Sequence, residues 1–224
     1  MGSLYWQLND CWPGASWSSI DYYGKWKALH YKVKESFAPV IISHEFVNRD
    51  LQLTVVSDLL KDFEGEIEVV LSEFKDIEKI LRWNQKVKIQ ANSKKQVLTI
   101  PSDQLSSGID EKHTYLQLFL FDKTGVISKK NVYFLPFKDL ILPRPELEFS
   151  TENDKSNVLY VTVSSKNFAK GVHVTCNSPN NFSDNFFDLP IKGSKTISIP
   201  IDMDTDLESL IQSIELRSLW NSRR

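Results

Sequence analysis

The stretch Leu51-Gln52-Leu53-Thr54-Val55 places an apolar side chain at every second position. Successive side chains of a β-strand point to opposite faces of a sheet, so this alternation predicts a strand with one buried face. The same alternation returns twice further along the chain, over Ile67–Leu71 and over Leu116–Leu120. Together the three stretches indicate a protein built mainly from β-sheet.

Further strand candidates lie between and beyond these stretches. Turn signals such as Glu64-Gly65 and Thr124-Gly125 separate them. The additional candidates are Ile80–Ile89, Gln96–Ile100 and Val126–Leu135. Six or seven short strands with alternating faces in roughly 100 residues are typical of an immunoglobulin-like β-sandwich. We therefore expect one such sandwich over residues 40–142.

A proline-marked joint follows, with a second set of strands beyond it. Leu142-Pro143-Arg144-Pro145 is expected to be stiff and extended, because each proline fixes its own φ and disfavours helix in the residue before it. The strand candidates after the joint are Leu147–Phe149, Val158–Val163, Val172–Cys176, Phe186–Leu189, Thr196–Ile201 and Ile211–Leu216. They predict a second, smaller immunoglobulin-like sandwich over residues 143–224.

The first 38 residues differ from both sandwiches and hold four of the six tryptophans. Ser3–Leu8 has the composition of a short buried strand, Asn9–Gly24 that of a loop, and Lys25–Phe37 has helical spacing. This order describes one β/α unit. A parallel strand needs neighbouring strands on both sides and helices on both faces, so one unit cannot bury its own faces. Residues 1–38 are therefore incomplete by themselves.

The helix of this unit is expected to carry an apolar face made of Trp26, Leu29, Val33 and Phe37. We expect Trp26, Val33 and Phe37 to pack against the first sandwich or against a second chain. An exposed apolar surface of that size favours association, so a homo-oligomer formed through this unit is one expectation. We interpret Met1 as an internal methionine of a longer parent, or as a start codon placed there.

The composition excludes several kinds of partner and site. The formal net charge is -2 and no run of Lys and Arg approaches a nucleic-acid-binding patch, so nucleic acid is not an expected partner. No apolar run reaches the length of a membrane span, so no membrane partner is expected. The two cysteines, Cys11 and Cys176, lie far apart, which argues against a disulfide framework and a Cys-x-x-Cys metal site. No cofactor or metal is expected.

The N-terminal unit resembles the end of the catalytic (β/α)8 barrel in the β-mannosidases of glycoside hydrolase family 2. The resemblance is carried by Leu4-Tyr5-Trp6-Gln7-Leu8-Asn9-Asp10-Cys11-Trp12 and by Ser16-Trp17-Ser18-Ser19-Ile20-Asp21-Tyr22-Tyr23-Gly24-Lys25-Trp26-Lys27-Ala28-Leu29-His30-Tyr31. The first stretch is similar to the family's eighth barrel strand, and the second to the loop and helix that follow. Phe182–Phe187 is more weakly similar to part of the family's last sandwich. The resemblance implies two accessory sandwiches after the barrel.

The resemblance also implies a substrate-binding role for residues near the end of the strand. In such barrels the functional residues lie at the C-terminal ends of the strands. In the family a tryptophan at the end of the eighth strand lines the subsite of the cleaved sugar, and this role falls on Trp6, with Trp12 second. Barrel core for Trp6 and loop packing for Trp12 are the alternatives. Asp10 is a substrate-binding candidate too, although an Asn-Asp pair at a strand exit often caps a turn.

No catalytic residue is assigned to this chain. A retaining glycosidase needs two carboxyl groups about 5 Å apart, one as acid/base and one as nucleophile. In the family these come from the fourth and seventh barrel strands, and the acid/base follows an asparagine. No Asn-Glu dipeptide occurs in this sequence. The resemblance therefore implies a C-terminal piece of a retaining exo-β-mannosidase that is inactive alone, whose parent releases terminal mannose from β-mannosides.

Two other functions stay open. The sandwiches can form a non-catalytic module that binds a glycan or a protein partner, since sandwiches of this class serve many functions. The same piece can also come from a family member that acts on β-glucosaminides or β-galactosides, because most pocket residues would lie outside this chain. A β-mannoside or another glycan is the expected substrate of the parent. The sequence does not indicate a compartment.

Overall fold

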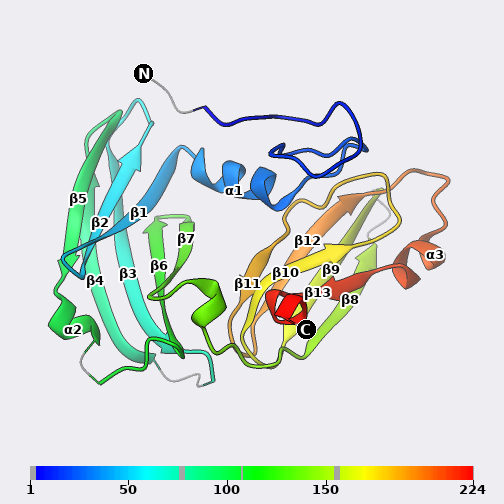
Figure 1. Ribbon diagram of the computed structural model, residues 1–224. Helices are drawn as coiled ribbons and strands as arrows, with labels where there is room; N and C mark the ends of the chain where they lie inside the picture. The colour runs from blue at the N-terminus through cyan, green and yellow to red at the C-terminus, as the bar shows by residue number, and fades with distance from the viewer. Residues whose placement is uncertain (1–3, 76–78, 107, 154–156, 224) are drawn as a thin grey trace. The chain divides into compact units, whose positions relative to one another are not determined.

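The computed structural model describes residues 4–75, 79–106, 108–153 and 157–223 (Figure 1). The chain is mainly β and forms two compact units. One unit is Ser36–Ile141. The other combines the N-terminal residues up to Glu35 with the chain from Leu142 onward.

The unit Ser36–Ile141 is a sandwich of two antiparallel sheets. The three-stranded sheet has the order β1-β2-β5, with strands Val40–Val47, Asp50–Ser57 and Ser93–Ile100. The four-stranded sheet has the order β4-β3-β6-β7, with strands Lys79–Ile89, Phe63–Glu73, Thr114–Asp122 and Gly125–Tyr133. Two short helices, α2 (Ser102–Ser106) and η1 (Phe137–Asp139), lie in its connections.

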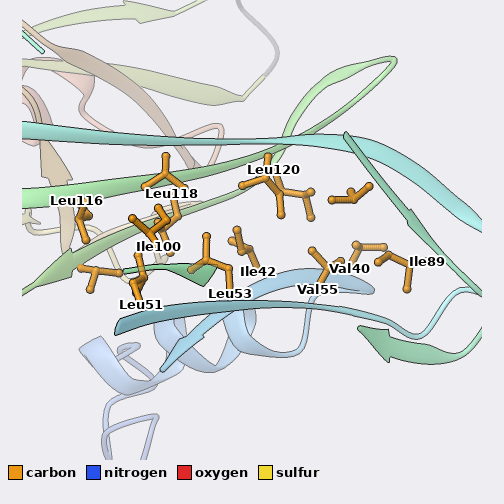
Figure 2. Close-up of a cluster of buried hydrophobic side chains, with 14 of the residues drawn as sticks. Val40, Ile42, Leu51, Leu53, Val55, Ile89, Ile100, Leu116, Leu118 and Leu120 are labelled. Atoms are coloured by element: carbon orange, nitrogen blue, oxygen red, sulfur yellow. The ribbon is translucent and has the colours of Figure 1, made fainter. Parts of the chain in front are cut away.

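The alternating stripes of the sequence form the core of this sandwich. Leu53 of β2 and Leu118 of β6 are fully buried, and so are the other members of their stripes. Figure 2 shows these side chains pointing from the two sheets toward each other. The prediction of a sandwich from period-two alternation is confirmed here. Strand β1, whose pattern was not recognised in the sequence, also contributes Val40 and Ile42 to the core.

The second sandwich follows the proline-marked joint. One sheet has the order β12-β9-β8, with strands Ser194–Pro200, Val158–Ser165 and Leu147–Asn153. The other has the order β11-β10-β13, with strands Phe187–Leu189, Ala169–Thr175 and Glu215–Arg217. Helix α3 (Leu207–Gln212) precedes β13, and η2 (Leu219–Arg223) follows it. A separate apolar core that includes Val161, Val172 and Ile199 fills this sandwich.

The strand predicted over Ile211–Leu216 is largely wrong. Helix α3 ends at Gln212, and only the short strand β13 follows. Asp206 caps the helix, since its side chain accepts a hydrogen bond of 3.2 Å from the Ser209 N–H. The apolar residues Leu207, Leu210, Ile211 and Ile214 recur at intervals of three or four, which is a helical period.

The N-terminal unit also departs from its prediction. Within the described part of Ser3–Leu8, residues 4–8 form no strand, and the backbone makes only isolated bridges between Asn9 and Ile20 and between Ile20 and Trp26. A lone parallel strand has no neighbours to complete its hydrogen bonds, which explains this. Helix α1 is shorter than predicted, at Ala28–Ser36. Its buried residue is Tyr31, whereas two members of the predicted apolar face, Leu29 and Phe37, are exposed.

Candidate functional site

Backbone hydrogen bonds fold the segment before α1 into a defined loop. The Ile20 N–H donates to the Leu8 carbonyl over 2.9 Å, and the Asp10 N–H donates to the Ile20 carbonyl over 3.0 Å. Ser19 is fully buried, and its hydroxyl also donates to the Leu8 carbonyl over 3.0 Å. These bonds bring the two ends of the loop together, so residues 7–10 and 18–20 lie side by side.

The tryptophans of this loop are exposed. Trp6 is 78% exposed, Trp12 is 73% exposed and Trp17 is 80% exposed. Trp6 and Trp12 are the two tryptophans proposed from the sequence, and Trp17 joins them as a third exposed indole. An exposed indole offers a large flat apolar face at a low cost in conformational entropy.

Asp10 points the other way and is buried. The Lys27 ammonium lies 2.8 Å from its Oδ2, and the Ser16 hydroxyl donates to its Oδ1. The same ammonium donates to the Ser18 hydroxyl over 2.8 Å. These partners, with the Lys27 hydrogen bond as the largest effect and the Ser16 hydrogen bond next, lower the pKa of Asp10 to about 2.

This geometry limits what Asp10 can do. A carboxyl group with a pKa of about 2 is ionised near neutral pH, so it has no proton to give to a leaving group. Both of its oxygens already have hydrogen-bond partners within the loop. Lys27 and Ser16 were not singled out in the sequence, because their partnership with Asp10 depends on how the loop closes.

The described residues offer little for other site chemistry. In residues 4–75, 79–106, 108–153 and 157–223, no three or more His, Cys, Asp and Glu side chains are grouped to hold a metal ion. Cys11 and Cys176 are both free thiols. None of the helices in this part of the chain is long and apolar enough to cross a membrane.

The N-terminal segment docks on the second sandwich. The Trp26 N–H donates to Oδ1 of Asn181 over 2.9 Å, and Nδ2 of Asn181 donates to the Gly24 carbonyl over 2.9 Å. The Tyr31 hydroxyl donates to the Phe182 carbonyl over 3.2 Å. Tyr31, the buried residue of the helix, was not part of the expected contact, and the packing of Trp26, Val33 and Phe37 against the first sandwich or a second chain stays a prediction.

Comparison with known proteins matches both sandwiches. A family model described as a mannosidase Ig/CBM-like domain matches residues 49–139. A second family model, described as an Ig-fold domain, matches residues 142–222. The β-mannosidase A of Aspergillus oryzae is 28% identical over 240 residues, which cover 99% of this chain and 26% of that protein. The chain thus matches a mannosidase Ig/CBM-like domain and an Ig-fold domain, and it is similar over nearly its whole length to a β-mannosidase.

Two further β-mannosidases match the chain over nearly its whole length. The β-mannosidase of Mus musculus is 29% identical over 231 residues, covering 99% of this chain and 26% of the mouse protein. The crystal structure of the β-D-mannosidase from Dictyoglomus thermophilum superposes with a TM-score of 0.77 at 26% identity, covering 96% of this chain and 26% of that one. The chain thus spans about a quarter of the length of these β-mannosidases.

Proposed function

We propose that this chain is the C-terminal part of a retaining exo-β-mannosidase, and that it lends the sugar pocket the indole of Trp6, with Trp12 second. The complete enzyme would release terminal mannose from β-mannosides. The two sandwiches would serve as accessory domains. The carboxyl groups that perform the reaction would belong to the remaining three quarters of the enzyme.

The observation that carries this proposal is the contrast inside the N-terminal loop. The loop is folded and contributes no strand to either sandwich, yet it leaves its tryptophans exposed and buries a single acid, Asp10. A loop that only packed against a sandwich would place its indoles in the interface. Flat aromatic faces held on a fixed loop suit the apolar face of a pyranose ring.

The chemistry of a retaining glycosidase assigns the rest. One carboxyl group attacks the sugar, and a second protonates the leaving oxygen and later activates water. Asp10 fits neither role, because it is ion-paired with Lys27 and stays ionised. Trp6 would contribute by holding the sugar in the reactive orientation. Positioning of this kind affects the rate when the reacting atoms must be closely aligned.

An exchange of matching parts tests the proposal. The part of the Dictyoglomus thermophilum β-D-mannosidase that this chain matches would be replaced by this chain, and the chimera assayed on p-nitrophenyl β-mannoside. We expect activity in the chimera, none in the chain alone, and a loss of about 100-fold in kcat/KM for Trp6→Ala, of the size seen when a positioning contact is lost. Trp17→Ala is the matched control and should change kcat/KM less than threefold.

Three results would contradict the proposal. Turnover by the chain alone would show that it carries its own catalytic pair. A folded chimera without activity would remove the pocket role. Preference of the chimera for p-nitrophenyl β-glucosaminide or β-galactoside would move the chain to another substrate. Glycan binding by the chain alone, measured by titration calorimetry, would instead favour an independent binding module.

A further inference from the structure

The loop between β10 and β11 is held firmly by its own sandwich. Asn185 is buried, and its side-chain amide forms two hydrogen bonds with the backbone of Val174, of 2.9 Å and 2.8 Å. The Ser183 N–H donates to the Ser198 carbonyl over 2.7 Å, and the Ser198 N–H donates to the Ser183 hydroxyl over 2.9 Å. The loop is thus attached to strands β10 and β12, in both sheets of the sandwich.

This fixed loop presents a row of hydrogen-bonding groups to the N-terminal segment. Three of its carbonyl groups accept from side chains of that segment, at Ser178 and Asn180 from the Lys25 ammonium and at Phe182 from Tyr31. A fourth, at Ser183, accepts from the Lys34 ammonium over 3.1 Å. In Figure 1 the segment before α1 lies along this loop, which connects β10 and β11.

The side chain of Asn181 forms two hydrogen bonds with the backbone of the N-terminal segment, one as acceptor and one as donor. Its Oδ1 accepts from the Trp26 N–H, and its Nδ2 donates to the Gly24 carbonyl. A side-chain amide has one acceptor and one donor group, so it can replace a backbone partner in this way. The two hydrogen bonds hold the backbone at Gly24 and at Trp26, the residues on either side of Lys25.

The contact continues from these two hydrogen bonds into the loop that carries the tryptophans. Lys27 follows Trp26 directly, and its N–H donates to the Ser19 carbonyl over 2.8 Å. Its ammonium group binds Asp10, which lies between Trp6 and Trp12. Hydrogen bonds therefore join the β10–β11 loop to the backbone at Trp26, and the next residue, Lys27, to Ser19 and Asp10 in the loop that carries the exposed tryptophans.

We propose that the loop Ser178–Phe186 is a docking site for the Gly24–Lys34 segment, and that Asn181 is a positioning residue that sets the place of the Trp6–Trp12 loop. The docking itself is independent of the proposed function. Its consequence for sugar binding rests on that function. The C-terminal sandwich would then hold the tryptophan loop in position for the sugar pocket, rather than act as a spacer or a separate binding module.

Hydrogen exchange of the chain alone tests the docking. Asn181→Ala removes both bonds, and we expect the amides of Asp10, Ser19 and Ile20 to exchange about tenfold faster, because two net hydrogen-bond contributions are lost. Asn181→Asp keeps the acceptor for Trp26 and should give a smaller increase. Asn167→Ala is the matched control, since Asn167 donates to the Arg144 carbonyl over 3.0 Å within the same sandwich. It should leave these three amides unchanged.

The chimera with the Dictyoglomus thermophilum enzyme tests the consequence. Asn181→Ala should raise KM for p-nitrophenyl β-mannoside about tenfold while kcat falls less than threefold, since a displaced indole weakens sugar binding. Unchanged exchange in Asn181→Ala would overturn the docking. Faster exchange with unchanged KM in an active chimera would overturn the positioning role. An inactive parent chimera would count against the proposed function alone, because hydrogen exchange decides the docking without it.

Discussion

The Asp10 carboxylate accepts hydrogen bonds from the Lys27 ammonium and the Ser16 hydroxyl, and these bonds lower its pKa to about 2. An acid in this state stabilises the loop as an anion. The Asn9-Asp10 pair predicted a turn cap through bonds to the backbone, whereas the Asp10 carboxylate accepts from the side chains of Lys27 and Ser16. Its partner could not be foreseen, because Lys27 is 17 residues away and meets Asp10 only when the loop has closed.

Replacing Asp10 with Asn should loosen the loop at neutral pH. The folded pKa lies below the ordinary value of 3.8, so the stabilisation is present above about 3.8 and is lost as the pH falls through about 2. In the wild-type chain, the protection factors of the Ser19 and Ile20 amides, which correct for the intrinsic pH dependence of exchange, should therefore fall only toward pH 2. In Asp10→Asn they should already be low at pH 7. Equal exchange in both proteins at pH 7 would contradict the ion pair.

His44 gives the first sandwich a separate pH dependence. Burial, with a smaller contribution from the nearby positive charge of Lys130, lowers the pKa of His44 from 6.5 to about 4. The folded state therefore favours neutral His44. Its contribution to stability is complete above about 6.5 and is lost as the pH falls through about 4. Urea unfolding of Ser36–Ile141 in the full chain should show this loss, and His44→Leu should reduce it.

At the scale of elements, the strands with regular alternation were predictable and the N-terminal unit was not. Stripes such as Leu51–Val55 follow from the period-two alternation of apolar side chains alone. In the structure they face the opposite sheet of the sandwich and form its core. The segment before α1 follows no local period, and its structure depends both on bonds across its own loop and on bonds to residues about 150 positions away, such as Asn181. Its exposed tryptophans were predicted as candidates only through resemblance.

The buried stripes should dominate the stability of the first sandwich. Leu53→Ala removes a fully buried side chain from the middle of β2, and we expect a loss of about 2–5 kcal/mol in the free energy of unfolding. Lys94 is an exposed residue of β5 in the same sheet, and Lys94→Ala should lower the free energy of unfolding by less than about 0.5 kcal/mol. Urea denaturation monitored by circular dichroism measures both. A similar loss for the two variants would refute the assignment of the stripe to the core.

At the scale of the whole molecule, the chain forms two hydrophobic cores, and the N-terminal segment packs with the C-terminal one. The unit that holds the C-terminal sandwich also holds the first 35 residues, although the first sandwich separates them in sequence. Tyr31 shows how this attachment works. It is only 2% exposed, its ring packs 5.9 Å from that of Phe186, and its burial raises its pKa to about 12. A residue near the N-terminus thus completes the packing of a domain near the C-terminus.

Tyr31→Ala should therefore weaken the C-terminal unit and spare the first sandwich. We expect a loss of about 3 kcal/mol in the distant unit, as for other large buried aromatic residues. Hydrogen exchange can report the two units separately through strands β9 and β3. Phe37→Ala, which removes a side chain that is 59% exposed, is the control and should change neither. Faster exchange in β3 but not β9 would reverse the assignment.

The two hydrogen bonds of Asn181 have a consequence for how the protein is produced. Asn181-Phe182-Ser183 matches the acceptor pattern for N-linked glycosylation, and the oligosaccharide would be joined to Nδ2, the atom that donates to Gly24. A yeast-secreted preparation glycosylated at this residue should therefore show the smaller increase in exchange expected for Asn181→Asp, because Oδ1 still accepts from Trp26, whereas bacterial material should not. The expression host therefore decides whether the hydrogen bond from Asn181 to Gly24 forms and whether the tryptophan loop is held in place.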